Sequence, residues 1–133
     1  MRGKPWEVRR SPRRATFAKV ADAVQSQESG GRVGIQGPDT IYGRAAGLMQ
    51  VLPGTAKDMA AKLGLAYRPE LLTGTTPEAA DYQRQIGEAY LREGMSKTGN
   101  LYDALRYYHG GPNRALWGPK TNAYASSILE RLR

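Results

Sequence analysis

Apolar side chains recur at helical spacing near the start of the chain. Four of them occupy positions i, i+3, i+4 and i+7 of one helix face: Phe17, Val20, Ala21 and Val24. Two glycines, Gly30 and Gly31, follow this stripe, and glycine is the residue that most often ends a helix. The pattern therefore predicts a helix from Thr16 to about Ser29.

Four later segments combine an apolar stripe with signals for a helix start or a helix end. Pro53 suits the first position of a helix, and Thr76 and Asn100 are residue types that cap helix N-termini. Gly64 and Gly99 are placed to end two of these segments. We expect helices over residues 53–63, 76–99, 100–108 and 120–132.

Two segments between these helices lack a helical period. Residues 30–47 contain six glycines together with Pro38 and Asp39, which predicts a long irregular loop with room for a small hairpin. Residues 48–51 fit either a brief strand or an extended turn, and residues 65–76 are expected to form a loop. The sum is a mainly α fold of about five helices with a small irregular or β insertion around residues 30–51.

One carboxylate falls on the apolar face of the first predicted helix. Glu28 follows Phe17 by about three helical turns, so it points in the same direction as the apolar stripe. It also lies in the last turn, at the negative end of the helix dipole. Burial and the dipole both raise the pKa of a carboxyl group, which suits a general acid that works near neutral pH. Spacing alone equally allows a glutamate that reaches solvent or pairs with an arginine.

Composition limits the possible architectures. The chain has 133 residues, no cysteine and a formal net charge of +8. This length suits one domain with one modest core, and disulfides are impossible. No apolar run is long enough to span a membrane. One histidine, no cysteine and no calcium-loop pattern argue against a metal site.

Most of the positive charge lies ahead of the predicted domain. Residues 1–14 carry six of the twenty basic side chains and one acid, whereas the remaining residues carry fourteen basic and eleven acidic groups, or about +3. We expect a basic leader or linker over residues 1–14 and a domain over residues 15–133. The leader is not a signal peptide, because no apolar region follows it. Apart from Trp6, aromatic residues are not interleaved with the charges of the leader, so a stacking platform for bases is poorly supported there. No nucleic-acid partner is expected for the folded domain.

Short motifs then occur in a characteristic order. They are Glu28-Ser29, Gly47-Leu48-Met49-Gln50, Tyr108-His109-Gly110-Gly111 and Thr121-Asn122-Ala123-Tyr124. Together they resemble the lytic transglycosylase family with the soluble-transglycosylase (SLT) catalytic domain. That family carries Glu-Ser, Gly-Leu-Met-Gln, an Ala-Tyr-Asn-Ala-Gly-like segment and Thr-x-x-Tyr. Each motif alone is weak, but their common order over residues 16–132 makes the resemblance specific.

The resemblance implies a lysozyme-like fold and an enzyme that cuts the β-1,4 bond between N-acetylmuramic acid and N-acetylglucosamine in peptidoglycan. It implies Glu28 as the sole acid and base, a 1,6-anhydromuramic product and no cofactor. It also implies a substrate-binding set: Ser29, Gly47, Leu48, Met49, Gln50, Tyr90, Tyr108, His109 and Tyr124. Within this set Tyr90 and Tyr108 fit core packing as well as sugar contact, and His109 replaces the usual asparagine.

Two other functions remain open from the sequence. A hydrolytic muramidase would share Glu28 but use water, with Asp39 as a candidate base. A non-catalytic glycan-binding module would keep the fold without the chemistry. No second acid is reliably placed near Glu28, because Asp39 lies in the irregular segment and Asp22 lies on another helix face. We expect a monomer that acts on glycan strands in the bacterial envelope, as a phage virion enzyme or as part of a larger envelope protein.

Overall fold

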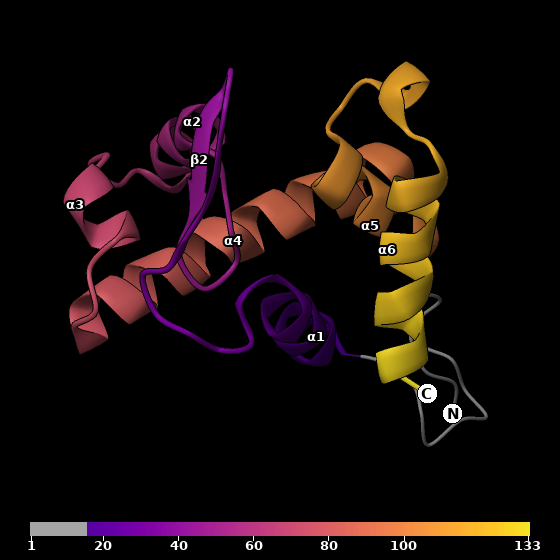
Figure 1. The fold of residues 1–133 in the computed structure, drawn as a ribbon, viewed down its shortest axis with the longest axis horizontal. Helices are drawn as coiled ribbons and strands as arrows, with labels where there is room; N and C mark the ends of the chain where they lie inside the picture. The colour runs from indigo at the N-terminus through magenta and orange to yellow at the C-terminus, as the bar shows by residue number, and fades with distance from the viewer. Residues whose placement is uncertain (1–15) are drawn as a thin grey trace.

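The computed structural model describes residues 16–133, so the predicted basic leader over residues 1–14 lies outside the described residues. The longest element is helix α4 (Pro77–Thr98), which crosses the whole fold in Figure 1 and contacts α1, α2, α3 and α5. Helix α1 (Phe17–Ser29) lies against its middle, α2 (Pro53–Leu63) lies toward its start, and α5 (Leu101–Gly110) and α6 (Pro119–Arg131) lie toward its end. The mainly helical fold predicted from the apolar pattern is confirmed.

The helix ends follow the predicted capping chemistry. The side chains of Thr16, Thr76 and Asn100 each accept a hydrogen bond from a backbone N–H three residues later. Pro53 occupies the first turn of α2, and Gly30 ends α1 in a left-handed conformation. Within the described residues, no helix has the length and apolar character needed to cross a membrane.

The segment between α1 and α2 contains a hairpin. Strand β1 (Gln36–Thr40) pairs antiparallel with β2 (Gly43–Ala46), and the register shifts between Gln36 and Asp39. The following residues 47–50 form a turn, after which Val51 makes a single bridge to Ala46. An extended turn is thus the correct alternative for residues 48–51.

The prediction of an uninterrupted loop over residues 65–76 was wrong, because Pro69–Leu72 forms a short helix, α3. Four residues are too few to show a helical period. Pro69 begins the turn, and Leu71 and Leu72 are buried against the core. A 3₁₀ turn, η1 (Arg114–Leu116), was also missed for the same reason of length.

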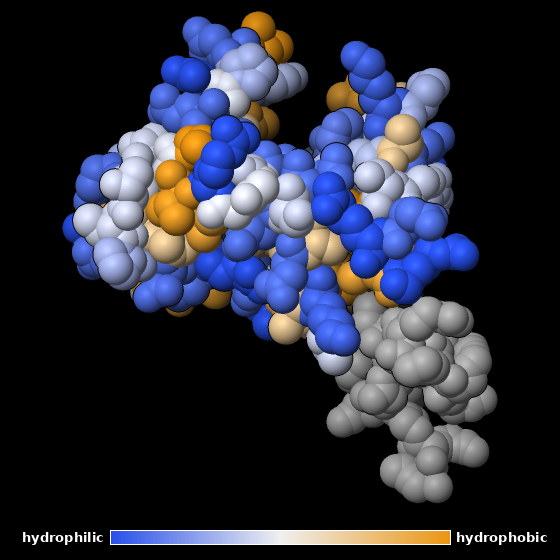
Figure 2. All heavy atoms as spheres, turned by 60° about the horizontal axis from the view of Figure 1, so that its bottom comes forward, coloured by the Kyte–Doolittle hydropathy of each residue, from blue (hydrophilic) through white to orange (hydrophobic). Residues whose placement is uncertain are grey.

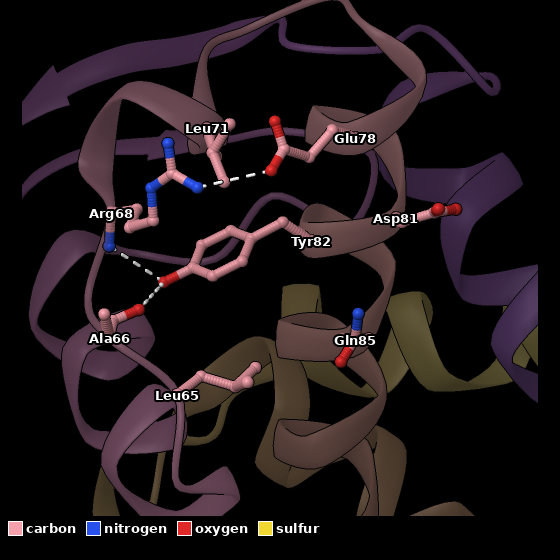
Figure 3. Close-up of a pocket in the computed structure, with 8 residues that line it drawn as sticks. All are labelled: Leu65, Ala66, Arg68, Leu71, Glu78, Asp81, Tyr82 and Gln85. Carbon is pink, nitrogen blue, oxygen red and sulfur yellow. Dashed lines mark hydrogen bonds and ion pairs between the residues drawn. The ribbon is translucent and has the colours of Figure 1, made fainter.

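A shallow hollow lies where the connection from α2 to α3 passes over α4 (Figure 3). The hydroxyl of Tyr82 at its floor accepts a hydrogen bond from the Arg68 N–H and donates one to the Ala66 carbonyl, both at 2.9 Å. Across the hollow, Arg68 forms an ion pair with Glu78. These bonds fasten the connection to α4, and the hollow shares no lining residue with the cleft described below.

Candidate active site

A cleft of about 600 Å³ separates the hairpin from the segment that joins α5 to α6. In Figure 2 two lobes rise on either side of this gap. The hairpin contributes Pro38, Thr40 and Tyr42 to one wall, and residues 109–113 with Leu116 form the other. Glu28 from α1 lies between the walls, together with Tyr90 from α4 and Tyr108 from α5.

Glu28 has the electrostatic character expected of a general acid. Burial raises its pKa from 4.5 to about 7, and this effect outweighs the lowering caused by a hydrogen bond from Tyr124. The Tyr124 hydroxyl donates that bond to Oε2 over 2.6 Å. The hydrogen-bond partner of Glu28 is therefore a tyrosine. With a pKa of about 7, the carboxyl group is protonated for much of the time at neutral pH. The proposed pairing with an arginine is not observed among the described residues.

The ring of Tyr124 is held in place by its neighbours. The His109 imidazole stacks on it with ring centroids 4.6 Å apart, and His109 Nδ1 lies 3.1 Å from the Thr121 hydroxyl. Partial burial lowers the pKa of His109, so the imidazole is mainly neutral at neutral pH. His109 lines the cleft, whereas Tyr124 reaches the site through Glu28.

Tyr108 connects the cleft to the turn at residues 47–50. Its side chain is buried and its hydroxyl donates a 2.7 Å hydrogen bond to the Met49 carbonyl. The ring of Tyr90 packs at a tilt against Tyr108 with centroids 5.1 Å apart, and burial raises the pKa of Tyr90 to about 12. Both rings belong to the packed interior and also line the cleft, so the two interpretations left open by the sequence are compatible.

Of the turn at residues 47–50, Gln50 alone lines the cleft. Gln50 lines the cleft with a positive φ of 51°, and its amide nitrogen donates to the carbonyls of Ile35 and Gly47. The side chains of Leu48 and Met49 are buried in the core. Met49 packs directly over Gly87 of α4, where any side chain would collide with it.

Ser29 is turned away from the cleft. Its hydroxyl donates to the Gln25 carbonyl at 3.1 Å and accepts from the Gly31 N–H at 3.0 Å, and the side chain is buried. The structure thus brings five predicted site residues to the cleft surface: Glu28, Gln50, Tyr90, Tyr108 and His109. Tyr124 joins them behind Glu28, and four others lie outside the lining: Ser29, Gly47, Leu48 and Met49.

Gln83, which was not predicted as a functional residue, supports the turn at residues 47–50 through its side-chain amide. Its Oε1 accepts from the Gly34 and Leu48 N–H groups at 3.0 and 2.9 Å. Its Nε2 donates to the carbonyls of Leu71 and Gly74 at 2.8 and 2.9 Å. The signal was present, because this polar residue lies within the apolar stripe of its helix, three positions before Ile86.

Among the described residues that line the cleft, Glu28 is the single carboxylate. Asp39 is exposed on β1 opposite Arg44, and Asp22 pairs with Arg84 at 2.8 Å. A glycosidase that uses two carboxylates needs them about 5 to 9.5 Å apart across the scissile bond. The lining offers Glu28 no such partner.

Comparison with known proteins agrees with this geometry. Residues 10–129 match the family described as "Transglycosylase SLT domain". A transglycosylase of Enterobacteria phage PRD1 is 36% identical over 116 residues, which cover 85% of this chain and 36% of the phage protein. The X-ray structure of an inactive mutant of the lytic transglycosylase Slt from Pseudomonas aeruginosa has a TM-score of 0.68 at 26% identity. That match covers 86% of this chain and 20% of the bacterial one.

The chain therefore spans about a third of the length of the phage protein and a fifth of the bacterial protein. The family predicted from the order of the four motifs is confirmed. The fold is helical, and its cleft contains one glutamate with a pKa near 7. Because the family match also covers nearly the whole described chain, this protein belongs to the transglycosylase SLT domain family.

Proposed function

We propose that this chain is a peptidoglycan lytic transglycosylase in which Glu28 is the single general acid and base. The observation that carries the proposal is the placement of Glu28, bonded to Tyr124, in a cleft whose described lining holds no second carboxylate. Burial there raises the pKa of Glu28 to about 7. A pKa near the working pH lets the same group give and take a proton at comparable cost. The substrate would be the glycan strand of a bacterial cell wall.

The reaction begins with neutral Glu28. Its proton passes to the glycosidic oxygen as the bond from that oxygen to C1 of N-acetylmuramic acid breaks. The N-acetyl oxygen of the same sugar stabilises the positive charge that develops at C1. The Glu28 carboxylate then removes the proton from the C6 hydroxyl, and O6 attacks C1 to close the 1,6-anhydro ring. An attacking group within the same sugar has a high effective concentration, so no water need be positioned.

Tyr124 is a positioning residue in this scheme. Its hydroxyl holds Oε2 of Glu28, which leaves Oε1 for the proton transfers. Gln50, Tyr90, Tyr108 and His109 would contact the sugars from the surrounding lining. The buried positions of four residues favour a role in supporting the cleft over direct contact with the sugars: Ser29, Gly47, Leu48 and Met49.

The named relatives support this function. The phage PRD1 relative is itself called a transglycosylase, and the Pseudomonas relative is a lytic transglycosylase. A hydrolytic muramidase remains the second candidate, since it would use the same acid with water. Nothing in the cleft lining favours it, because Asp39 faces solvent on the hairpin.

Mass spectrometry of purified peptidoglycan after digestion separates the two reactions. The transglycosylase leaves 1,6-anhydro ends, which are lighter by one water than the reducing ends left by a hydrolase. Fragments with reducing ends alone would contradict the proposed reaction while leaving Glu28 as an acid. No fragments at all would contradict both enzymes.

The activity is expected to depend on pH through Glu28. Because the acid must be protonated to begin the reaction and its pKa is about 7, kcat/KM should fall about tenfold per pH unit at higher pH. The Tyr124→Phe variant loses the hydrogen bond that lowers the Glu28 pKa, so this decline should move to higher pH. A series of kcat/KM values from pH 5 to 9 measures the shift.

The matched control is Tyr102→Phe, which removes a hydroxyl from α5 outside the cleft lining. It should reproduce the parent profile. A Tyr124→Phe profile with the decline at the parent position would show that this hydrogen bond does not set the acidity of Glu28.

A further inference from the structure

Two exposed apolar side chains stand on opposite walls of the cleft. Tyr42, in the turn of the hairpin, and Leu116, at the end of η1, are each 70% exposed and both line the cleft that contains Glu28. Large apolar groups that face a common cleft from both sides indicate a surface that a ligand covers.

The hairpin turn is held by its own polar side chain. The Thr40 hydroxyl donates a 2.6 Å hydrogen bond to the Gly43 carbonyl and accepts one of 3.1 Å from the Tyr42 N–H. These bonds close the turn and fix the backbone from which Tyr42 projects. The aromatic ring is therefore presented toward the cleft by a pre-organised turn.

The opposite wall is built in the same way. The Asn113 side chain accepts a 3.0 Å hydrogen bond from the Ala115 N–H, and the Asn113 carbonyl accepts one from the Leu116 N–H at 3.0 Å. The indole N–H of Trp117 donates to the Gly111 carbonyl at 2.8 Å. Leu116 thus projects from a tight, anchored turn.

We propose that Tyr42 and Leu116 form a clamp that grips the glycan strand on both sides of Glu28, an inference that rests on the proposed function. The Tyr42 ring would stack on the apolar C–H face of one sugar. Leu116 would contact the methyl groups of N-acetyl or lactyl substituents. Apart from Glu28 the described lining carries no acidic or fully charged side chain, which suits a neutral polyol with apolar faces.

Ile41 provides a matched control within the same turn. Its side chain is 91% exposed, more than that of Tyr42, but it does not line the cleft. A clamp on the glycan needs Tyr42 and not Ile41. Docking of the hairpin tip on a lipid surface or a second copy of the chain would depend on Ile41 at least as strongly.

The test measures binding without cleavage. The Glu28→Gln chain is mixed with insoluble purified peptidoglycan, sedimented, and quantified in the supernatant over a range of peptidoglycan concentrations. Adding Tyr42→Ala should weaken binding about three- to tenfold, and Leu116→Ala should weaken it in the same direction. Tyr42→Phe should bind like the parent because it keeps the ring. Ile41→Ala should also bind like the parent.

The outcomes distinguish the clamp, docking of the hairpin tip and the proposed function itself. Binding of the Tyr42→Ala and Leu116→Ala chains equal to that of the parent would overturn the clamp and leave the proposed function intact. An equal loss of binding in Ile41→Ala would overturn the clamp, because binding would then depend on the exposed hairpin tip and not on the side chains that line the cleft. If the Glu28→Gln chain does not bind peptidoglycan and the unmodified chain does not cleave it, the proposed function itself is wrong. Unchanged melting temperatures are expected throughout, since these side chains are exposed, and they exclude misfolding as a cause.

Discussion

Replacing Glu28 with glutamine is expected to abolish cleavage of peptidoglycan and, at pH 8, to make the protein more stable than the parent. The amide keeps the size of the side chain and can still accept the hydrogen bond from Tyr124. It cannot donate a proton to the glycosidic oxygen or remove one from the C6 hydroxyl. General acid–base steps contribute about 10²- to 10⁴-fold each, so we expect a loss of at least about 10³-fold in kcat.

The gain in stability follows from the same pKa. A carboxyl group with a pKa of 4.5 when unfolded and about 7 when folded binds more protons in the native state between these values. The free energy of unfolding of the parent therefore falls as the pH rises from 4.5 through 7. At pH 8 the difference between the folded and the unfolded pKa lowers the free energy of unfolding of the parent by about 3 kcal/mol. Neutral glutamine avoids this loss.

Urea unfolding at pH 4 and pH 8 measures this effect. The Glu28→Gln variant should exceed the parent at pH 8 and equal it at pH 4, where the parent carboxyl is protonated in both states. Glu130→Gln, at an exposed position of α6, is the control and should change stability by less than about 0.5 kcal/mol at either pH. Equal stability of Glu28→Gln and the parent at pH 8 would mean that burial of Glu28 does not raise its pKa.

The position of Glu28 was predictable because it depends on local geometry. Helical spacing puts it on the face of Phe17 and Val24, and Gly30 fixes the end of the helix two residues later. The partner of Glu28 was not predictable from spacing. Tyr124 is distant in sequence, and only the packing of α6 against α1 brings its hydroxyl to the carboxylate. The resemblance placed Tyr124 in the substrate-binding set, and it did not predict the hydrogen bond from Tyr124 to Glu28.

The apolar rims of the cleft were missed for a different reason. Tyr42 and Leu116 lie in turns, where side-chain periodicity carries no information. For Ser29 the motif predicts a place in the substrate-binding set, and the structure shows that its hydroxyl bonds to backbone groups at the end of α1. Sequence motifs identified the family, whereas the direction of each side chain came from tertiary contacts.

Replacing Gln83 with methionine is expected to cause the largest loss of stability of any single change considered for this fold. The side chain is 2% exposed and makes four hydrogen bonds to backbone groups of three separate segments. Methionine has a similar length but leaves two N–H groups and two carbonyls without partners. Each buried unsatisfied group costs about 1 to 3 kcal/mol, so after relaxation we expect a total loss of about 3 to 5 kcal/mol.

Urea unfolding measures this loss, with Gln85→Met as the matched control two residues along α4. Gln85 is exposed, so the same exchange there should change the free energy of unfolding by less than about 0.5 kcal/mol. A loss below about 1 kcal/mol for Gln83→Met would mean that the four backbone groups find other partners.

One of the four backbone groups is the Leu48 N–H, which lies next to Met49, whose carbonyl binds Tyr108. The folded fraction of Gln83→Met should therefore also have a lower kcat than the Gln85→Met control. Gln83 would then support the cleft as well as the core, in a chain whose total stability is expected to be only about 5 to 15 kcal/mol.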